Sequence, residues 1–169
     1  KNMYVEFDAC VLSNLLYCLN AHRLPHNEHD AASYKYIRAV VESDRYVQEP
    51  FRCAHHYPRT ALIIYHIARL IAAHDPLLLR PIIPKLIADA YRLLNQATHP
   101  MDRVILSTSL VRLGQNPPAL AVHDYTRADF EGFYFFIAGL LTAYEQPLLY
   151  KLASFPLFHI RWTCEAHCW

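Results

Sequence analysis

Glycine is scarce in this sequence, with three glycines among 169 residues. An all-β protein needs positive φ angles in its many tight turns, and glycine adopts these angles most easily, so the scarcity argues against that class. Three glycines also cannot build a glycine-rich phosphate loop. The Gly-x-Ser-x-Gly turn of a serine hydrolase is absent as well.

Charge is low and balanced, because 18% of the residues are charged and the net charge is +1. This balance gives no positive field for nucleic acid or for an acidic membrane surface. Because 54% of the residues are hydrophobic, the chain can bury a sizeable core, which excludes disorder. We expect one domain over residues 1–169, with a weaker boundary near 115–128.

Long apolar segments are missing too. The longest uncharged apolar run, 132–144, is shorter than the roughly 20 residues that a membrane span needs, so no span is predicted. No basic segment followed by an apolar one opens the chain, so no secretory signal is visible. The first residue is Lys1 and the last are Cys168 and Trp169, which suggests a segment of a longer polypeptide.

Five cysteines make an odd number, and two of them lie in apolar helical surroundings: Cys10, Cys18, Cys53, Cys164 and Cys168. This pattern is typical of reduced thiols and predicts a cytoplasmic protein.

The hydrophobic periodicity is helical almost throughout. It predicts five helices. The first follows the N-cap Asp8 and runs to about residue 20, and the second runs from the N-cap Asp30 to about 44. The third has Pro58 at its first position and ends at 74, the fourth covers 77–96, and the fifth runs from the N-cap Asp102 to Gly114. Residues 46–57 are expected to form a loop. Beyond residue 118 we expect a segment over 129–144 that starts extended and is helical from 137, a short segment over 148–153, and a last helix from about 163, without a β-hairpin.

Helices with few charges alternate with charged ones. The first, third and fifth helices are nearly uncharged and carry small or hydroxyl residues, whereas the second and fourth carry Lys, Arg, Asp and Glu. This alternation, with a repeat of about fifty residues, is typical of helical hairpins stacked in two layers. The sequence therefore predicts an all-α fold.

Three short motifs resemble a known architecture: the helix that opens at Asp8 and carries Asn14, the pair Tyr57-Pro58, and the helix with Asp102 that ends in Leu113-Gly114. They resemble bacterial proteins of uncharacterised function with the α–α toroid of terpenoid cyclases and protein prenyltransferases. The resemblance runs over 4–114 and resumes at 162–169. It implies an arc or a partial toroid, because a complete toroid needs about twelve helices and this chain holds fewer. The Asp-x-Asp-Asp and Asp-Asp-x-x-Asp motifs of the cyclases are absent, so the resemblance implies an architecture and no cyclase activity.

Several polar residues are expected to converge at one mouth of this arc, and the candidates are Asp8, Asn14, Tyr57, Arg59 and Asp102. Helix N-termini present free N–H groups that suit an anionic ligand. In an enzyme, Asp8 or Asp102 would be the general acid or base, and Arg59 or Arg69 would hold the anionic group. The alternative is that Asp8 and Asp102 are ordinary N-caps.

Histidine is abundant, with eleven residues. Two clusters hold ligand types that suit zinc: Cys53, His55 and His56, and Cys164, His167 and Cys168. Neither has the paired-cysteine spacing of a zinc ribbon, so no cofactor is predicted, with Zn or Mg as the alternative. His66, alone among isoleucines and leucines, is interpreted as a core residue bonded to a neighbour.

These observations lead to two functional hypotheses. The first is a cytoplasmic binding domain that takes a protein partner or a small hydrophobic or anionic ligand on its concave face, lined by Asn14, Tyr57, Tyr65, Ser107 and Thr108. The second is an enzyme of the toroid class that acts on an isoprenoid or a carbohydrate-like substrate through Asp8 or Asp102.

Overall fold

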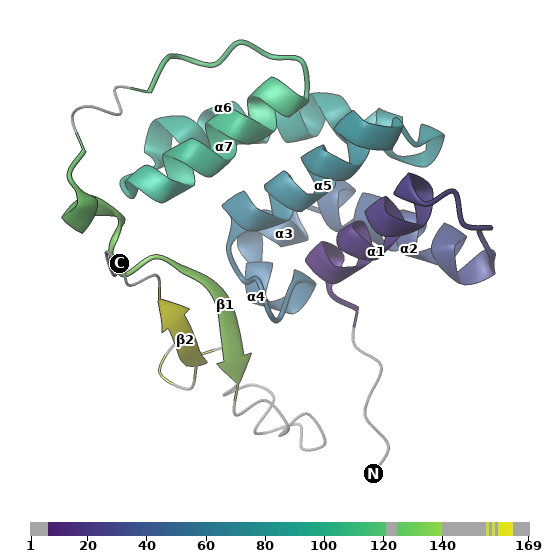
Figure 1. The fold of residues 1–169 in the computed structure, drawn as a ribbon, viewed down its shortest axis with the longest axis horizontal. Helices are drawn as coiled ribbons and strands as arrows, with labels where there is room; N and C mark the ends of the chain where they lie inside the picture. The colour runs from purple at the N-terminus through teal and green to yellow at the C-terminus, as the bar shows by residue number, and fades with distance from the viewer. Residues whose placement is uncertain (1–6, 121–124, 140–154, 156, 158, 164–169) are drawn as a thin grey trace.

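The computed structural model describes residues 7–120, 125–139, 155, 157 and 159–163. The protein is all-α, as predicted, and its long helices are α1 (Ala9–Ala21), α2 (Glu28–Glu42), α5 (Thr60–His74), α6 (Ile83–Gln96) and α7 (Pro100–Arg112). Shorter elements are α3 (Arg45–Gln48), α4 (Pro50–Cys53), η1 (Leu77–Ile82) and η3 (Arg127–Phe130). Two strands, β1 (Tyr134–Gly139) and β2 (His159–Thr163), complete the described part (Figure 1).

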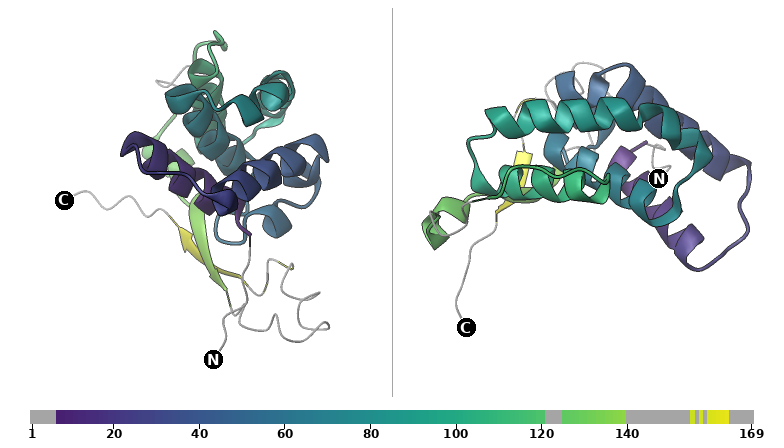
Figure 2. Two further views of the ribbon diagram at one scale, coloured as in Figure 1. Left: turned by 90° about the vertical axis from the view of Figure 1, so that its right-hand side faces the viewer. Right: turned by 90° about the horizontal axis from the view of Figure 1, so that it is seen from above.

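The long helices form two layers. Helix α5 packs between α1 and α7, while α2, η1 and α6 pack behind them (Figures 1 and 2). The core between the layers is made mainly of aliphatic side chains from all five helices, among them Leu16, Ile37, Ile67, Leu86 and Leu106. We call α1, α5 and α7 the front layer. It contains the first, third and fifth helices of the predicted alternation, although α7 carries three charged residues, as many as α6.

Some of the predicted helix ends are confirmed. The Asp8 carboxylate accepts the backbone N–H groups of Cys10 and Val11 at 2.9 and 3.0 Å, so Asp8 is the N-cap of α1. Gly114 follows α7 with φ +75°, which is the left-handed conformation expected of a glycine at that position.

Two predicted N-caps are wrong. Asn27 caps α2, and Asp30 lies inside the first turn, where its carboxylate accepts the Asn27 N–H at 2.8 Å in a capping box. His99 caps α7, because Pro100 favours the first helical position, and Asp102 lies in the first turn instead.

Other predicted bounds also need correction. Pro58 does not open α5, which begins at Thr60 after Arg59 as N-cap. The helical unit predicted over 77–96 starts as the 3₁₀ helix η1, which contains Pro81, and continues as α6, with Pro84 in its first turn. The loop expected over 46–57 contains most of α3 and all of α4, because Pro50 starts a helical turn and Tyr46 anchors the segment in the core.

The region after residue 130 departs most from the prediction. Ile137 and its neighbours up to Gly139 are in β1 and not in a helix, because aromatic and β-branched residues favour a strand. Strand β1 pairs with β2 in antiparallel register, with Ile137 opposite Arg161. Thr163 ends β2. The predicted helix over 140–144, the segment over 148–153 and the helix beyond 163 lie outside the described residues.

Candidate functional site

A polar cluster lies where α1 and α5 meet in the front layer. Asn14 projects from α1, and its side-chain oxygen accepts from Arg69 Nη2 at 2.7 Å and contacts His66 Nδ1 at 2.9 Å. His66 and Arg69 stand one turn apart on α5, so both reach the same residue of the neighbouring helix. We call Asn14, His66 and Arg69 the front cluster. Sequence analysis selected two of its three members as ligand-binding candidates.

The protonation state of His66 follows from its surroundings. Burial, together with the nearby charge of Arg69, lowers the pKa of His66 to about 4. The imidazole is therefore neutral at pH 7. Because Arg69 can only donate, it faces the oxygen of Asn14, and the hydrogen of His66 then lies on Nδ1 and is donated to that oxygen. The expectation that His66 is bonded to a neighbour is confirmed.

Aromatic rings hold the cluster in place. The Arg69 guanidinium lies over the Tyr17 ring, with Cζ 4.4 Å from its centroid, and the Tyr57 and Tyr65 rings are 5.4 and 5.5 Å from the imidazole of His66. A guanidinium stacked on an aromatic face loses little freedom when it binds an anion. Sequence reasoning missed Tyr17, although its position one turn after Asn14 places it on the same side of α1.

Arg69 has no acidic partner. Within the described part of the chain it forms no ion pair, and its Nε atom is buried without a hydrogen-bond acceptor. Helix α1 has no charged residue, and α5 has no acidic one. The single carboxylate of the front layer belongs to Asp102 of α7, which pairs with Arg59, so this layer has an excess of positive charge.

Apolar side chains stand in solvent beside the cluster. Val11 and Leu15 of α1 are 45% and 48% exposed, and Cys18, one turn further, is exposed as well. Across α5, the exposed Arg112 of α7 lies over the Tyr65 ring at 5.5 Å. We call the surface made by Val11, Leu15, Cys18, Arg69 and Arg112 the front face.

The other predicted site residues do not all join this cluster. Asp8 is buried, and its second carboxylate oxygen accepts the backbone N–H of His56 at 3.1 Å, so all three of its described contacts are with backbone. Tyr57 lies between the front cluster and Asp8. Its ring contacts His66, and its pKa is raised first by burial and then by the nearby Cys10 and Asp8. Of the hydroxyl residues expected on the face, Ser107 is buried and Thr108 bonds the Val104 carbonyl at 2.7 Å.

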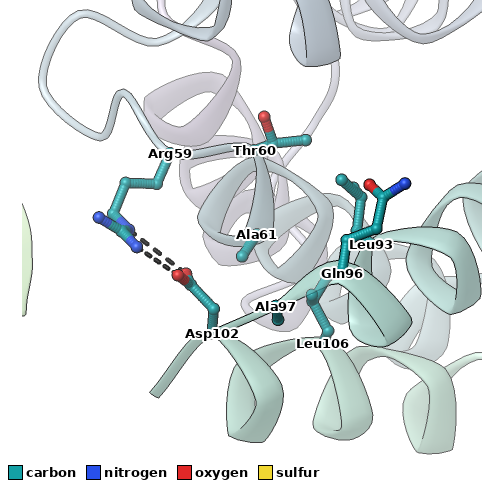
Figure 3. A pocket seen from close by; sticks show the side chains of 8 residues that line it. All are labelled: Arg59, Thr60, Ala61, Leu93, Gln96, Ala97, Asp102 and Leu106. Atoms are coloured by element: carbon teal, nitrogen blue, oxygen red, sulfur yellow. Dashed lines mark hydrogen bonds and ion pairs between the residues drawn. The ribbon is translucent and has the colours of Figure 1, made fainter. Parts of the chain in front are cut away.

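Arg59 and Asp102 form a separate pair at the N-terminal ends of α5 and α7. The carboxylate takes two hydrogen bonds from the guanidinium (Figure 3). The guanidinium carbon also lies 4.4 Å from the Phe133 ring centroid and 4.9 Å from that of Tyr134. A cavity of about 240 Å³ adjoins this pair, and its other walls are Thr60, Ala61, Leu93, Gln96, Ala97 and Leu106.

The histidines and cysteines do not assemble a metal centre in the described residues, where no group of three or more His, Cys, Asp or Glu side chains could hold a metal ion. Burial raises the pKa of Cys10, and it raises that of Cys53 to about 11, so both thiols are protonated at neutral pH. The second predicted cluster, Cys164, His167 and Cys168, lies outside the described residues.

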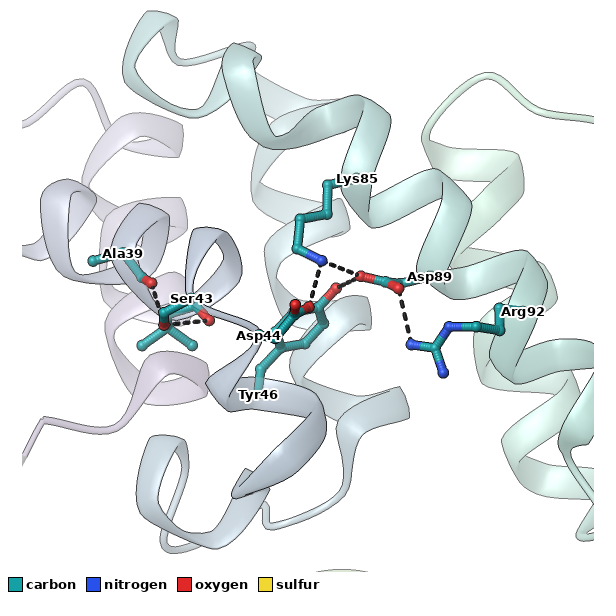
Figure 4. Close-up of polar contacts among 8 residues, drawn as sticks. Ala39, Ser43, Asp44, Tyr46, Lys85, Asp89 and Arg92 are labelled. Carbon is teal, nitrogen blue, oxygen red and sulfur yellow. Dashed lines mark hydrogen bonds and ion pairs between the residues drawn. The ribbon is translucent and has the colours of Figure 1, made fainter.

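A second polar network links α3 to α6 in the back of the molecule (Figure 4). The buried Tyr46 donates to the Asp89 carboxylate at 2.5 Å, and that carboxylate also accepts from Lys85 at 2.9 Å and Arg92 at 2.8 Å. Burial alone would raise the pKa of Asp89, but these three donors lower it. Every member has a partner within the fold, so we assign the network a structural role.

Comparisons with known proteins identify no relative: no family model, no curated protein and no solved structure matches this chain. Within the described residues, no helix combines the length and the apolar character needed to cross a membrane.

Proposed function

We propose that this chain is a helical binding domain that holds an anionic group at Arg69, on the front face of α1, α5 and α7. The observation that carries the proposal is the state of Arg69. Its guanidinium is fixed by Asn14 and Tyr17 and has no acidic partner among the described residues. A half-buried guanidinium without an opposite charge lowers the stability of the fold. Its presence among aliphatic side chains therefore favours a ligand that supplies the missing negative charge.

The alternative hypothesis is an enzyme of the terpenoid cyclase-like class with Asp8 or Asp102 as acid or base. No contact among the described residues favours it. Asp8 accepts three backbone N–H groups, and both oxygens of Asp102 accept from Arg59. A general acid or base needs an oxygen that can reach a substrate, so this hypothesis stays a prediction.

Two further features belong to the proposal. The order of α1, α5 and α7 in one layer supports an arc or a partial α–α toroid. The described cysteines, Cys10, Cys18 and Cys53, are free thiols, which supports a reducing compartment such as the cytoplasm.

The direct test is an NMR titration that observes the Nε–H signals of the arginines. Inorganic phosphate and acetate are added separately at constant ionic strength, with chloride as the reference salt. We expect a saturable change in the signal of Arg69 with at least one of the two anions, and none in the signal of Arg38, which already pairs with Glu42 at 2.7 Å. A response that is equal for both arginines, or absent for Arg69, would refute the proposal.

A thermal-shift assay gives an independent reading. A ligand at about a hundred times its dissociation constant adds about 2.7 kcal/mol of stability, which raises Tm by several degrees in a chain of this size. Arg69→Gln should abolish the shift, whereas the matched variant Arg38→Gln should keep it.

A further inference from the structure

We infer that the group that pairs with Arg69 belongs to an acidic amphipathic helix of a partner protein, which lies along α1 on the front face. This inference rests on the proposed function, because it names the class of ligand for the same arginine. Three observations support it: the spacing of the exposed apolar residues, their open position and the charge around them.

The spacing on α1 is that of a helix-packing seam. Val11, Leu15 and Cys18 follow each other at intervals of four and three residues, so they form a single line along the helix. Each is exposed while the opposite side of α1 packs into the core through Ala9, Cys10 and Leu16. The helix therefore has a second apolar side that lacks a helix against it among the described residues.

The open position of these side chains favours a helix over a small molecule. Small ligands are held in concave sites that surround most of their surface. Val11 and Leu15 are about half exposed and project from a convex helix, so they can cover only one side of a ligand. A second helix presents its own side chains at the matching interval and fills the spaces between them.

The charge around the seam selects an acidic partner. Asn14 lies one turn from both Val11 and Cys18, so the guanidinium of Arg69, bonded to Asn14, lies beside the seam. Arg112 contributes a second cation on the far side of α5. Because α1 is uncharged, α5 has no carboxylate, and Asp75 at the end of α5 is paired with Arg80, glutamates that flank the apolar side of a partner helix would meet these cations.

The experiment is a selection from a library of helical peptides about four turns long. Each peptide carries leucines at intervals of four and three residues, and the flanking positions are randomised among Glu, Gln and Lys. We expect the full chain to enrich peptides with Glu at the flanking positions. Enrichment of Lys, or no enrichment over the starting library, would overturn the inference.

Variants of the chain then place the peptide. In fluorescence anisotropy with an enriched peptide, Leu15→Glu and Arg69→Gln should each weaken binding about tenfold or more. The matched control is Ala88→Glu, because Ala88 is exposed on α6, which packs behind the front layer, and the change should not affect binding. Equal binding by Leu15→Glu and the unmodified chain would overturn the inference, since the seam would then not be the contact.

The NMR titration separates this failure from failure of the proposed function. If Arg69 binds phosphate or acetate saturably but no acidic helix is enriched, the face binds a small anion and the partner helix is refuted. If Arg69 gives no response to either anion and no peptide is enriched, both proposals fail together.

Discussion

The hydrogen bond between Tyr46 and Asp89 offers a quantitative test of how α3 is held against α6. Tyr46→Phe keeps the buried ring and removes only the hydroxyl that donates to the carboxylate at 2.5 Å. A hydrogen bond to a charged acceptor contributes about 1.5–3 kcal/mol, and the remaining donors, Lys85 and Arg92, moderate the loss. We therefore expect the free energy of unfolding to fall by about 2 kcal/mol and Tm by about 4–8 °C.

Urea unfolding at pH 7 measures this change in a double-mutant cycle with Asp89→Asn. The double variant should lose less stability than the sum of the single variants, because the shared bond is lost only once. The control is Tyr91→Phe, which removes a hydroxyl from the half-buried Tyr91 of the same helix as Asp89, where the described part of the chain offers no hydrogen bond. A loss in Tyr46→Phe no larger than in this control, or losses that are simply additive with Asp89→Asn, would refute the assigned role.

Three further predictions concern the front layer. The pKa of His66 is about 4 in the folded chain and about 6.5 when unfolded, so its contribution to stability is complete above pH 6.5 and is lost as the pH falls to 4. Comparison of His66→Gln with the unmodified chain at pH 7 and pH 5 should show that the variant loses less stability on acidification; an equal loss would contradict the shifted pKa. Asn14→Ala leaves Arg69 Nη2 and His66 Nδ1 without their acceptor and should cost about 1–3 kcal/mol in urea unfolding, whereas a neutral result would show that water replaces it. Asp8→Ala should cost about 1 kcal/mol or more through loss of the α1 cap, while Asp8→Asn should cost less; equal losses would mean that capping is not its role.

The sequence predicted the long helices well and their first residues less well. The sequence predicts Asp30 and Asp102 as N-caps, but both lie in the first turn of their helices. An acidic residue stabilises a helix start at the cap and also within the first turn, so the residue type alone does not distinguish the two positions. Pro100 was the better signal for α7, because proline favours the first helical position.

The candidate site was predicted in part because its residues stand on regular helices. Asn14 and Arg69 were selected from different segments, and the packing of α1 against α5 brings them together. Arg59 and Asp102 were expected in the same group but form their own pair, since side-chain partners across helices depend on packing that periodicity does not encode. The predicted extended start of the segment over 129–144 agrees with β1, but its continuation as a strand to Gly139 is not predicted, because its partner β2 lies some twenty residues further along the chain.

The position of Arg59 between Asp102 and the rings of Phe133 and Tyr134 has a consequence for the order in which the fold opens. A two-stranded sheet is barely stable by itself, so β1 depends on its attachment to the helices through Arg59 and through Phe133, which is almost fully buried. Detachment of the segment that leads into β1 would remove Phe133 from the core, whereas the other buried members of the core come from residues 9–110. We therefore expect the amide hydrogens of this segment to exchange with solvent earlier than those of α5. Arg59 therefore connects the start of α5 to a segment more than seventy positions further along the chain. Because Arg59 is far in sequence from Phe133 and Tyr134, we expect the contact between them to form late in folding.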